Sequence, residues 1–116
     1  MGVAAVNGFV AVAAGAFAAH GLSGALTPHA LTIFETAARY QMYHALALGL
    51  CAATSREIAI RVPAWAFLAG IALFCGSLYG LALTGIGAFG FVTPAGGVAF
   101  LIGWAALAWA ALRKRT

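Results

Sequence analysis

Charge is what this sequence contains least. Only eight of its 116 residues are charged, six Lys or Arg and two Glu, while 65% are hydrophobic. Soluble domains carry roughly a quarter charged residues, and disordered segments carry few apolar ones. Both classes are therefore excluded, and a mean hydropathy of +1.04 indicates an integral membrane protein. The apolar runs are long and continuous, which predicts helices rather than the alternating strands of a membrane barrel.

Cysteine is also scarce. Cys51 and Cys75 are the only two, and no C-x-x-C motif is present. In the spans predicted below, they lie about 14 Å apart along the bilayer normal at ~1.5 Å per residue. A disulfide needs Cα atoms within about 7 Å of each other. We therefore expect two free thiols, buried as small apolar side chains.

The length of the chain accommodates four membrane spans with short connections, because each span needs about 20 apolar residues. His20 to Gly24 is predicted as a turn, and Thr27-Pro28 as a capped helix start. Pro63 and Pro94 are expected to open the third and fourth spans. The sequence predicts an all-α, polytopic membrane protein, a four-transmembrane-helix bundle forming a single domain, with spans at about residues 3–19, 28–53, 63–83 and 94–112.

Five of the six basic residues are confined to one side of this arrangement. Two connections, 20–27 and 84–93, contain no Lys or Arg. By the positive-inside rule, both termini and the 54–62 connection are expected in the cytoplasm. Orientation accounts for the net charge of +4, so we expect no nucleic-acid partner. The five clustered basic residues are Arg56, Arg61, Arg113, Lys114 and Arg115.

The second span carries most of the polar residues placed inside the membrane, where ionisable groups are costly and are candidates for function. Helical geometry, at about 100° per residue, puts Glu35, Arg39 and Tyr43 on one face. Tyr40 and His44 lie about 140–180° from Glu35, and Gln41 projects elsewhere. Polar residues on several faces predict that this span is largely surrounded by protein.

Two interpretations of these residues stay open. Glu35 and Arg39 are spaced for an i,i+4 ion pair near the headgroups. Alternatively, they form an outer-side polar site with His20 from the first span and Tyr79 from the third. His44, near the midplane, is expected to hydrogen-bond a neighbouring helix rather than ligate haem, since the other histidines lie at the outer side. The candidate polar site comprises His20, Glu35, Arg39, Tyr40, Gln41, Tyr43, His44 and Tyr79.

No motif for catalysis accompanies these residues. The sequence contains no P-loop, no nucleophile elbow and no zinc-ligand spacing. We expect no catalytic residue, no metal and no cofactor. The function predicted is that of a non-enzymatic bundle interacting with itself, with the lipid bilayer or with a membrane complex. The alternative is a small oligomeric transporter using His20, Glu35 and Arg39.

Four segments are distinctive: residues 15–22 (GAFAAHGL), 34–48 (FETAARYQMYHALAL), 76–79 (GSLY) and 93–97 (TPAGG). Together they resemble the YgdD-like family of small bacterial inner-membrane proteins of unknown function. The chain departs from the family at Ala18, where a Gly is usual, and in its less polar segment 86–92. The resemblance implies a four-helix protein of the bacterial inner (plasma) membrane with no assigned activity. It singles out His20 and the polar residues between Glu35 and His44.

Overall fold

Helices account for nearly all of residues 1–54 and 58–113, the part of the chain that this computed structural model describes. The longest α-helices are α1 (Gly2–Phe17), α2 (Pro28–Thr54) and α5 (Phe89–Arg113). A π-helical segment, η1 (Ala18–Leu22), extends α1. A second one, η2 (Ile71–Cys75), joins α3 (Ile58–Gly70) to α4 (Gly76–Thr84). The described chain therefore forms four helical rods, and the all-α prediction is confirmed.

Three of these rods are long and apolar enough to cross a membrane: Gly2–Leu22, Ile60–Thr84 and Phe89–Arg113. The remaining rod, α2, has 27 residues and is not among them. Its length of about 40 Å, at 1.5 Å per residue, exceeds the ~30 Å hydrocarbon core. Polar residues between Glu35 and His44 lower the mean hydropathy of α2, which explains why α2 does not qualify as a membrane span by composition.

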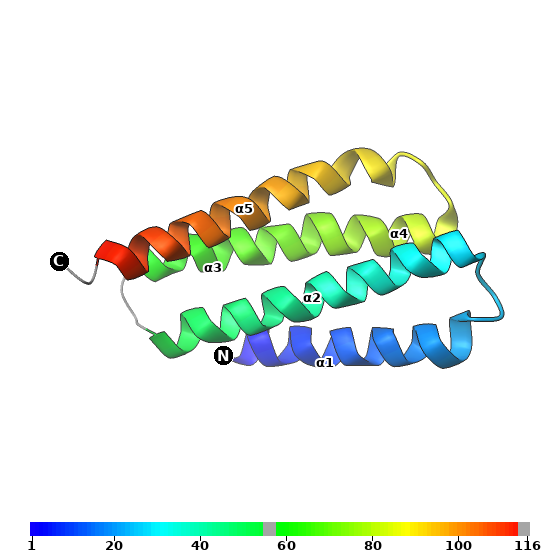
Figure 1. The fold of residues 1–116 in the computed structure, drawn as a ribbon, viewed down its shortest axis with the longest axis horizontal. Helices are drawn as coiled ribbons and strands as arrows, with labels where there is room; N and C mark the ends of the chain where they lie inside the picture. The colour runs from blue at the N-terminus through cyan, green and yellow to red at the C-terminus, as the bar shows by residue number, and fades with distance from the viewer. Residues whose placement is uncertain (55–57, 114–116) are drawn as a thin grey trace.

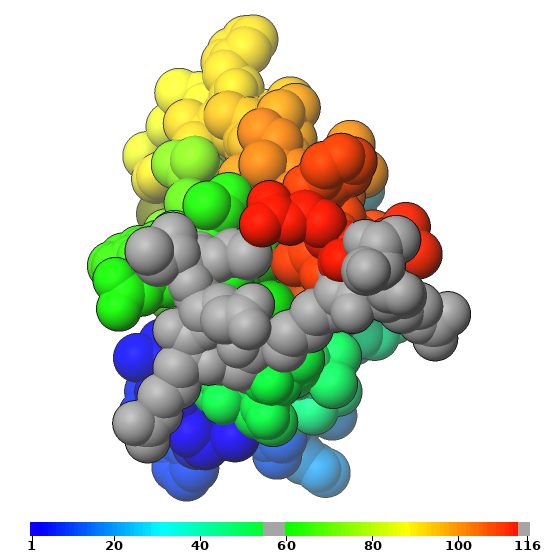
Figure 2. Space-filling model, turned by 90° about the vertical axis from the view of Figure 1, so that its left-hand side faces the viewer, coloured from blue at the N-terminus to red at the C-terminus, as the bar shows by residue number. Residues whose placement is uncertain are grey.

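The rods lie side by side in the order α1, α2, α3–α4 and α5, as Figure 1 shows. Helix α2 packs against α1 on one side and against α3, η2 and α4 on the other, while α5 packs along α3, η2 and α4. The result is elongated and flattened, 53 × 26 × 17 Å across its Cα atoms. End-on, the N-terminal residues, the start of α3 and the end of α5 are seen at the same end of the molecule (Figure 2).

The helix boundaries confirm one predicted start and correct two others. Pro28 is the first residue of α2, and the Thr27 side-chain oxygen accepts a hydrogen bond from the Ala30 N–H, 3.1 Å away. Pro63 and Pro94, however, lie inside α3 and α5 rather than at their starts. Helix α5 begins earlier because i→i−3 bonds, such as Phe89 N–H to the Ile86 carbonyl, wind the chain before Pro94.

Two predicted connections are shorter than expected. The turn predicted at His20 to Gly24 is wrong for its first residues, because the helix continues through η1 to Leu22. Burial of Leu22 beside Phe34 and Ala82 favours this continuation. Likewise α3 begins at Ile58, so Arg61 is helical rather than in a loop. Three of the basic residues predicted to set orientation, Arg56, Lys114 and Arg115, lie outside the described residues.

Glycines and aromatic rings make the closest contacts between rods. A Cβ added to Gly96 of α5 would collide with the backbone of Phe74 in η2. One added to Gly103 of α5 would collide with the ring of Phe67 in α3. Gly76, by contrast, faces open space. Cys51 and Cys75 are both free and buried, as predicted.

Candidate functional site

Gln41 links three helices through its side-chain amide. It is buried in α2, and its Oε1 accepts a hydrogen bond of 2.8 Å from the Tyr79 hydroxyl of α4. Its Nε2 donates to Asn7 Oδ1 of α1 at 3.1 Å. Asn7 in turn donates to the Val3 carbonyl at 2.9 Å. In this series of hydrogen bonds each side chain donates to the next, from Tyr79 to Gln41 and from Gln41 to Asn7. The series connects α4, α2 and α1 without a break.

His44, one turn further along α2, connects to α5. The Trp104 indole N–H donates to His44 Nε2 at 3.2 Å, and Nδ1 lies 2.7 Å from the Tyr40 carbonyl. An indole nitrogen only donates and a carbonyl only accepts. Nε2 therefore carries the lone pair, Nδ1 carries the proton, and the ring is neutral. The predicted hydrogen bond to a neighbouring helix is confirmed.

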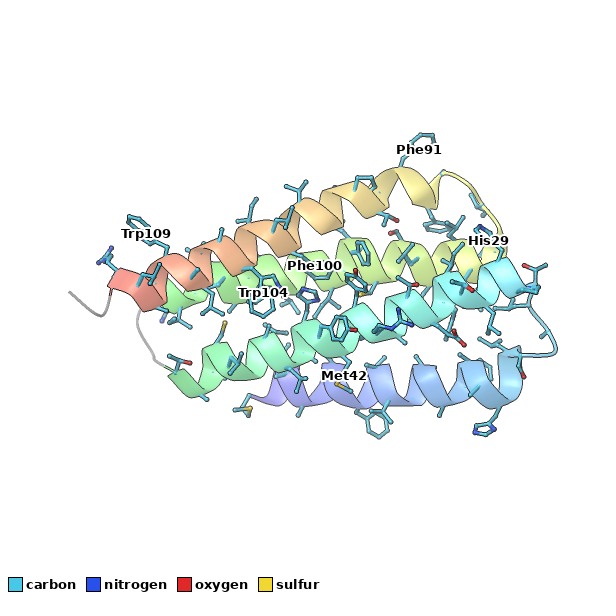
Figure 3. All side chains as sticks on the ribbon, viewed as in Figure 1. His29, Met42, Phe91, Phe100, Trp104 and Trp109 are labelled. Atoms are coloured by element: carbon cyan, nitrogen blue, oxygen red, sulfur yellow. The ribbon has the colours of Figure 1, made fainter. Side chains whose placement is uncertain are left out.

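An aromatic cluster encloses this imidazole. The His44 ring stacks on Phe100 with centroids 3.5 Å apart and planes 8° from parallel. Trp104 also meets Phe67 edge-on, with centroids 5.0 Å apart. Figure 3 shows Phe100 and Trp104 extending from α5 towards α2. Tyr40 packs on Phe74 at 4.8 Å. With both nitrogens bonded and one ring face covered, His44 has no free lone pair for a metal or haem.

Glu35, Arg39 and Tyr43 lie together on another side of α2. They line a depression of about 330 Å³ between α1 and α2, whose other lining residues are Ala11, Gly15, Ala38 and Met42. Glu35 is half-buried, and Arg39 and Tyr43 are exposed. Although both are described, no ion pair joins Glu35 to Arg39. The two charges share a surface without neutralising each other through direct contact.

The remaining two candidate residues lie apart from this depression. His20 belongs to η1, is exposed and does not line it. Tyr79 bonds to Gln41 and packs edge-on against Phe34, with centroids 4.9 Å apart. The eight candidates are thus divided between the Glu35 surface, the Gln41 hydrogen-bond chain and the His44 cluster, with His20 separate.

Sequence reasoning did not select several residues that hold the rods together. Asn7 was recognisable as the single amide in an otherwise apolar run. Trp104 was recognisable as a tryptophan far from the ends of its helix. Ser77 and Thr93 bridge α4 and α5 at 2.6 Å, and Ser77 also donates to the Phe74 carbonyl of η2. Nothing in the sequence distinguished this pair from other hydroxyl residues.

These contacts can fix the positions of the helices relative to one another. Within residues 1–54 and 58–113, no three His, Cys, Asp or Glu side chains could hold a metal ion together. In the same part of the chain, no buried side-chain nitrogen or oxygen lacks a hydrogen-bond partner. Buried polar groups that are all paired stabilise a unique packing.

Comparison with known proteins agrees with this description. Residues 14–97 match the family described as "Protein of unknown function (DUF423)". A UPF0382 membrane protein of Staphylococcus aureus (strain bovine RF122 / ET3-1) is 49% identical over 86% of this chain and 84% of its own length. The UPF0382 membrane protein YwdK of Bacillus subtilis is 42% identical, covering 94% and 92%. One from Haemophilus influenzae is 44% identical, covering 97% and 92%. No solved structure shows a significant match.

Proposed function

The chain belongs to the DUF423 family of membrane proteins of unknown function, and we propose that it is a four-span bundle of the bacterial inner membrane that acts by association rather than by catalysis. Its described residues are helical, and its relatives are described as membrane proteins. The resemblance to a family of unknown function is confirmed, while the name "YgdD-like" stays a prediction. The transporter alternative lacks support, since His20 and Tyr79 lie apart from the Glu35 surface. The Staphylococcus, Bacillus and Haemophilus relatives are described only as membrane proteins.

The surroundings of α2 support its role as the fourth span. It is flanked by α1 on one side and by α3 and α4 on the other, and these neighbours are rods apolar enough to cross a membrane. We propose that α2, which packs along both, lies in the same bilayer. Its most polar buried groups, Gln41 and His44, meet partners on other helices instead of lipid. This satisfies the rule that intramembrane polar groups face the protein interior.

The distribution of charge supports cytoplasmic termini. Arg61 and Arg113 lie at the end of the bundle that also contains the N-terminus, and the connections at the other end, residues 23–27 and 85–88, have no charged residue. Trp65 and Trp109 are exposed near the basic end, where tryptophan anchors helices in the interface. Figure 3 shows Trp109 projecting outward from α5.

A single observation supports the structural role. Among the described residues, every buried polar side chain forms hydrogen bonds within the bundle. Catalytic and transport sites leave polar groups available to a substrate, whereas these are paired. The exposed surface instead carries large apolar side chains, including Phe9 and Phe91. We infer that the chain associates through this surface with lipid, with further copies of itself or with a membrane complex.

A double-mutant cycle at Gln41 and Tyr79 tests the structural role. Gln41→Leu breaks bonds to two helices, and we expect it to lower the free energy of unfolding in mixed micelles by about 1–2 kcal/mol. Tyr79→Phe removes the shared bond, and we expect a coupling energy of about 0.6 kcal/mol or more between the changes. Zero coupling with unchanged stability of both single variants would overturn the structural role. Val12→Leu, on the exposed face of α1, is the control.

A further inference from the structure

The depression between α1 and α2 is an open surface with an apolar lining, and two residues of opposite charge, Glu35 and Arg39, lie along it. Its α1 side is formed by Ala11 and Gly15, and a Cβ added to Gly15 meets nothing within 4 Å. Its α2 side carries Glu35 and Arg39. No ion pair joins these two described side chains, and Glu35 is partly exposed and Arg39 exposed beside the depression.

The two charges lie at different depths. Glu35 is four residues closer than Arg39 to the Pro28 end of α2, which is about 6 Å at 1.5 Å per residue. In the proposed orientation this end is outside, so Glu35 leaves the helix further out in the outer leaflet than Arg39 does.

This order of charges matches one headgroup chemistry. We propose that the depression binds a zwitterionic glycerophospholipid with a primary ammonium, that is, a phosphatidylethanolamine of the outer leaflet. Arg39 meets the phosphate, which guanidinium groups bind through paired hydrogen bonds. Glu35 accepts hydrogen bonds from the ammonium further out, and one acyl chain lies over Gly15 and Met42. This assignment rests on the proposed function, because α2 must cross the membrane with Pro28 outside.

A second copy of the chain fits the same charges less well. In a two-fold dimer with parallel protomers, the same surface patch meets itself. Glu35 would then face its own counterpart at one depth, and Arg39 would face its counterpart at another. Such like-charge contacts are unfavourable, whereas a zwitterionic lipid presents the opposite charge at each depth. The geometry therefore favours lipid over self-association at this surface.

Competition between lipids tests the assignment on the unmodified protein. The purified chain in micelles is titrated with phosphatidylethanolamine, phosphatidylcholine and phosphatidylglycerol of identical acyl chains, and retained lipid is measured by native mass spectrometry. We expect phosphatidylethanolamine to be retained about 10-fold more tightly, which corresponds to ~1.4 kcal/mol. Choline has no N–H donor, and the glycerol headgroup has no cation. Equal retention of the three lipids, or preference for phosphatidylglycerol, overturns the proposal.

Matched variants locate the effect. Gly15→Leu fills the depression without changing charge and is expected to abolish the preference. Gly76→Leu, at another glycine with open space around its Cβ position, is expected to leave it intact. Loss of the preference in both variants, or in neither, would place the lipid elsewhere on the bundle and overturn the proposal.

A charge swap separates lipid from a second copy. Glu35→Arg/Arg39→Glu keeps the net charge but reverses the order of charges with depth. We expect it to lose the preference for phosphatidylethanolamine. A dimer of antiparallel protomers, in which Glu35 of one copy meets Arg39 of the other, would survive the swap, and such a dimer in the mass spectrum would contradict the proposal. If the swap does not fold, the wild-type competition and the Gly15→Leu comparison still decide.

This measurement is independent of the proposed topology. Lipid preference in micelles does not require any orientation in a membrane, whereas crossing by α2 is tested in cells by thiol labelling. A preference without crossing contradicts the topology alone. Crossing without a preference contradicts the lipid site alone.

Discussion

At the scale of the residue, His44 shows how a costly polar group is kept inside the bundle. Its two nitrogens have partners of opposite character, the Trp104 N–H and the Tyr40 carbonyl, and its ring stacks on Phe100. Without such partners, the free energy lost by removing the imidazole from water would exceed the free energy gained by stacking it on Phe100. The same logic applies to Gln41, whose amide oxygen and nitrogen bond to different helices. Each polar side chain thus specifies a position for a neighbouring rod.

Removing the indole N–H tests this account of His44. Trp104→Phe keeps an aromatic ring beside Phe67 but leaves His44 Nε2 buried without a donor. We expect the free energy of unfolding in mixed micelles to fall by about 1–2 kcal/mol. Trp109→Phe is the control, since Trp109 is 65% exposed and should change stability by less than about 0.5 kcal/mol. Equal effects of the two substitutions would mean that the hydrogen bond contributes nothing.

From the sequence, one can predict on which face of α2 a polar residue lies, but not which residue of another helix it contacts. Spacing of about 100° correctly separated Glu35 and Arg39 from His44, because the position of a side chain around a helix depends only on residue number. Tyr43 lies between the two groups, since its ring is also 5.6 Å from that of Tyr40 beside His44. The partners Asn7 and Trp104 were not selected, because they depend on which rods become neighbours. The one bond predicted in general terms, from His44 to another helix, followed from the cost of burying an unpaired imidazole.

At the scale of the element, α5 approaches the α3–α4 rod closely where it has glycine. Gly96 lies against the backbone of Phe74 within η2, and Gly103 lies against the Phe67 ring. The π-helical turn at Ile71–Cys75 widens the rod at this point, and Ser77 donates a hydrogen bond to its Phe74 carbonyl. Small residues at such contacts are a common means of packing helices in lipid, where no hydrophobic effect drives them together.

Adding one methyl group at Gly96 tests the close contact between α5 and η2. Gly96→Ala would place a Cβ against the Phe74 backbone, which cannot rotate away as a flexible side chain can. We expect a loss of about 1–3 kcal/mol in the free energy of unfolding, typical of overpacking. Gly76→Ala, which meets open space, should be neutral or stabilise by up to about 1 kcal/mol through helix propensity. A neutral Gly96→Ala variant would show that α5 does not need this approach.

Element boundaries were predictable where a local signal decides them. The start of α2 follows from Thr27 and Pro28, whose cap and fixed φ act within one turn. Pro63 and Pro94 were misleading, because each is the sixth residue of its helix, and the helix continues through the proline although that residue has no backbone N–H to donate. The π-helical segments had no sequence signal, since they depend on packing between rods.

At the scale of the whole molecule, two hairpins meet along α2. Helices α1 and α2 form one hairpin, and α3–α4 with α5 form the other, with all rods side by side (Figure 1). Four rods and their approximate lengths could be predicted, because apolar runs and breakers are local features. The order of the rods could not, because it depends on pairs such as Gln41 with Tyr79 that are distant in sequence. The flattened arrangement leaves α1 covered mainly by α2, and its outward face carries large apolar side chains.

Crossing of the membrane by α2 is the central claim, and thiol labelling in intact cells tests it most directly. Ser23→Cys, Thr54→Cys and Ile86→Cys are exposed reporters at the connections, and unmodified protein is the control because Cys51 and Cys75 are buried. We predict that a membrane-impermeant maleimide labels Ser23→Cys and Ile86→Cys in intact cells, and Thr54→Cys only after permeabilisation. Labelling of both Ser23→Cys and Thr54→Cys in intact cells, with Ile86→Cys protected, would show that α2 does not cross and would contradict the account.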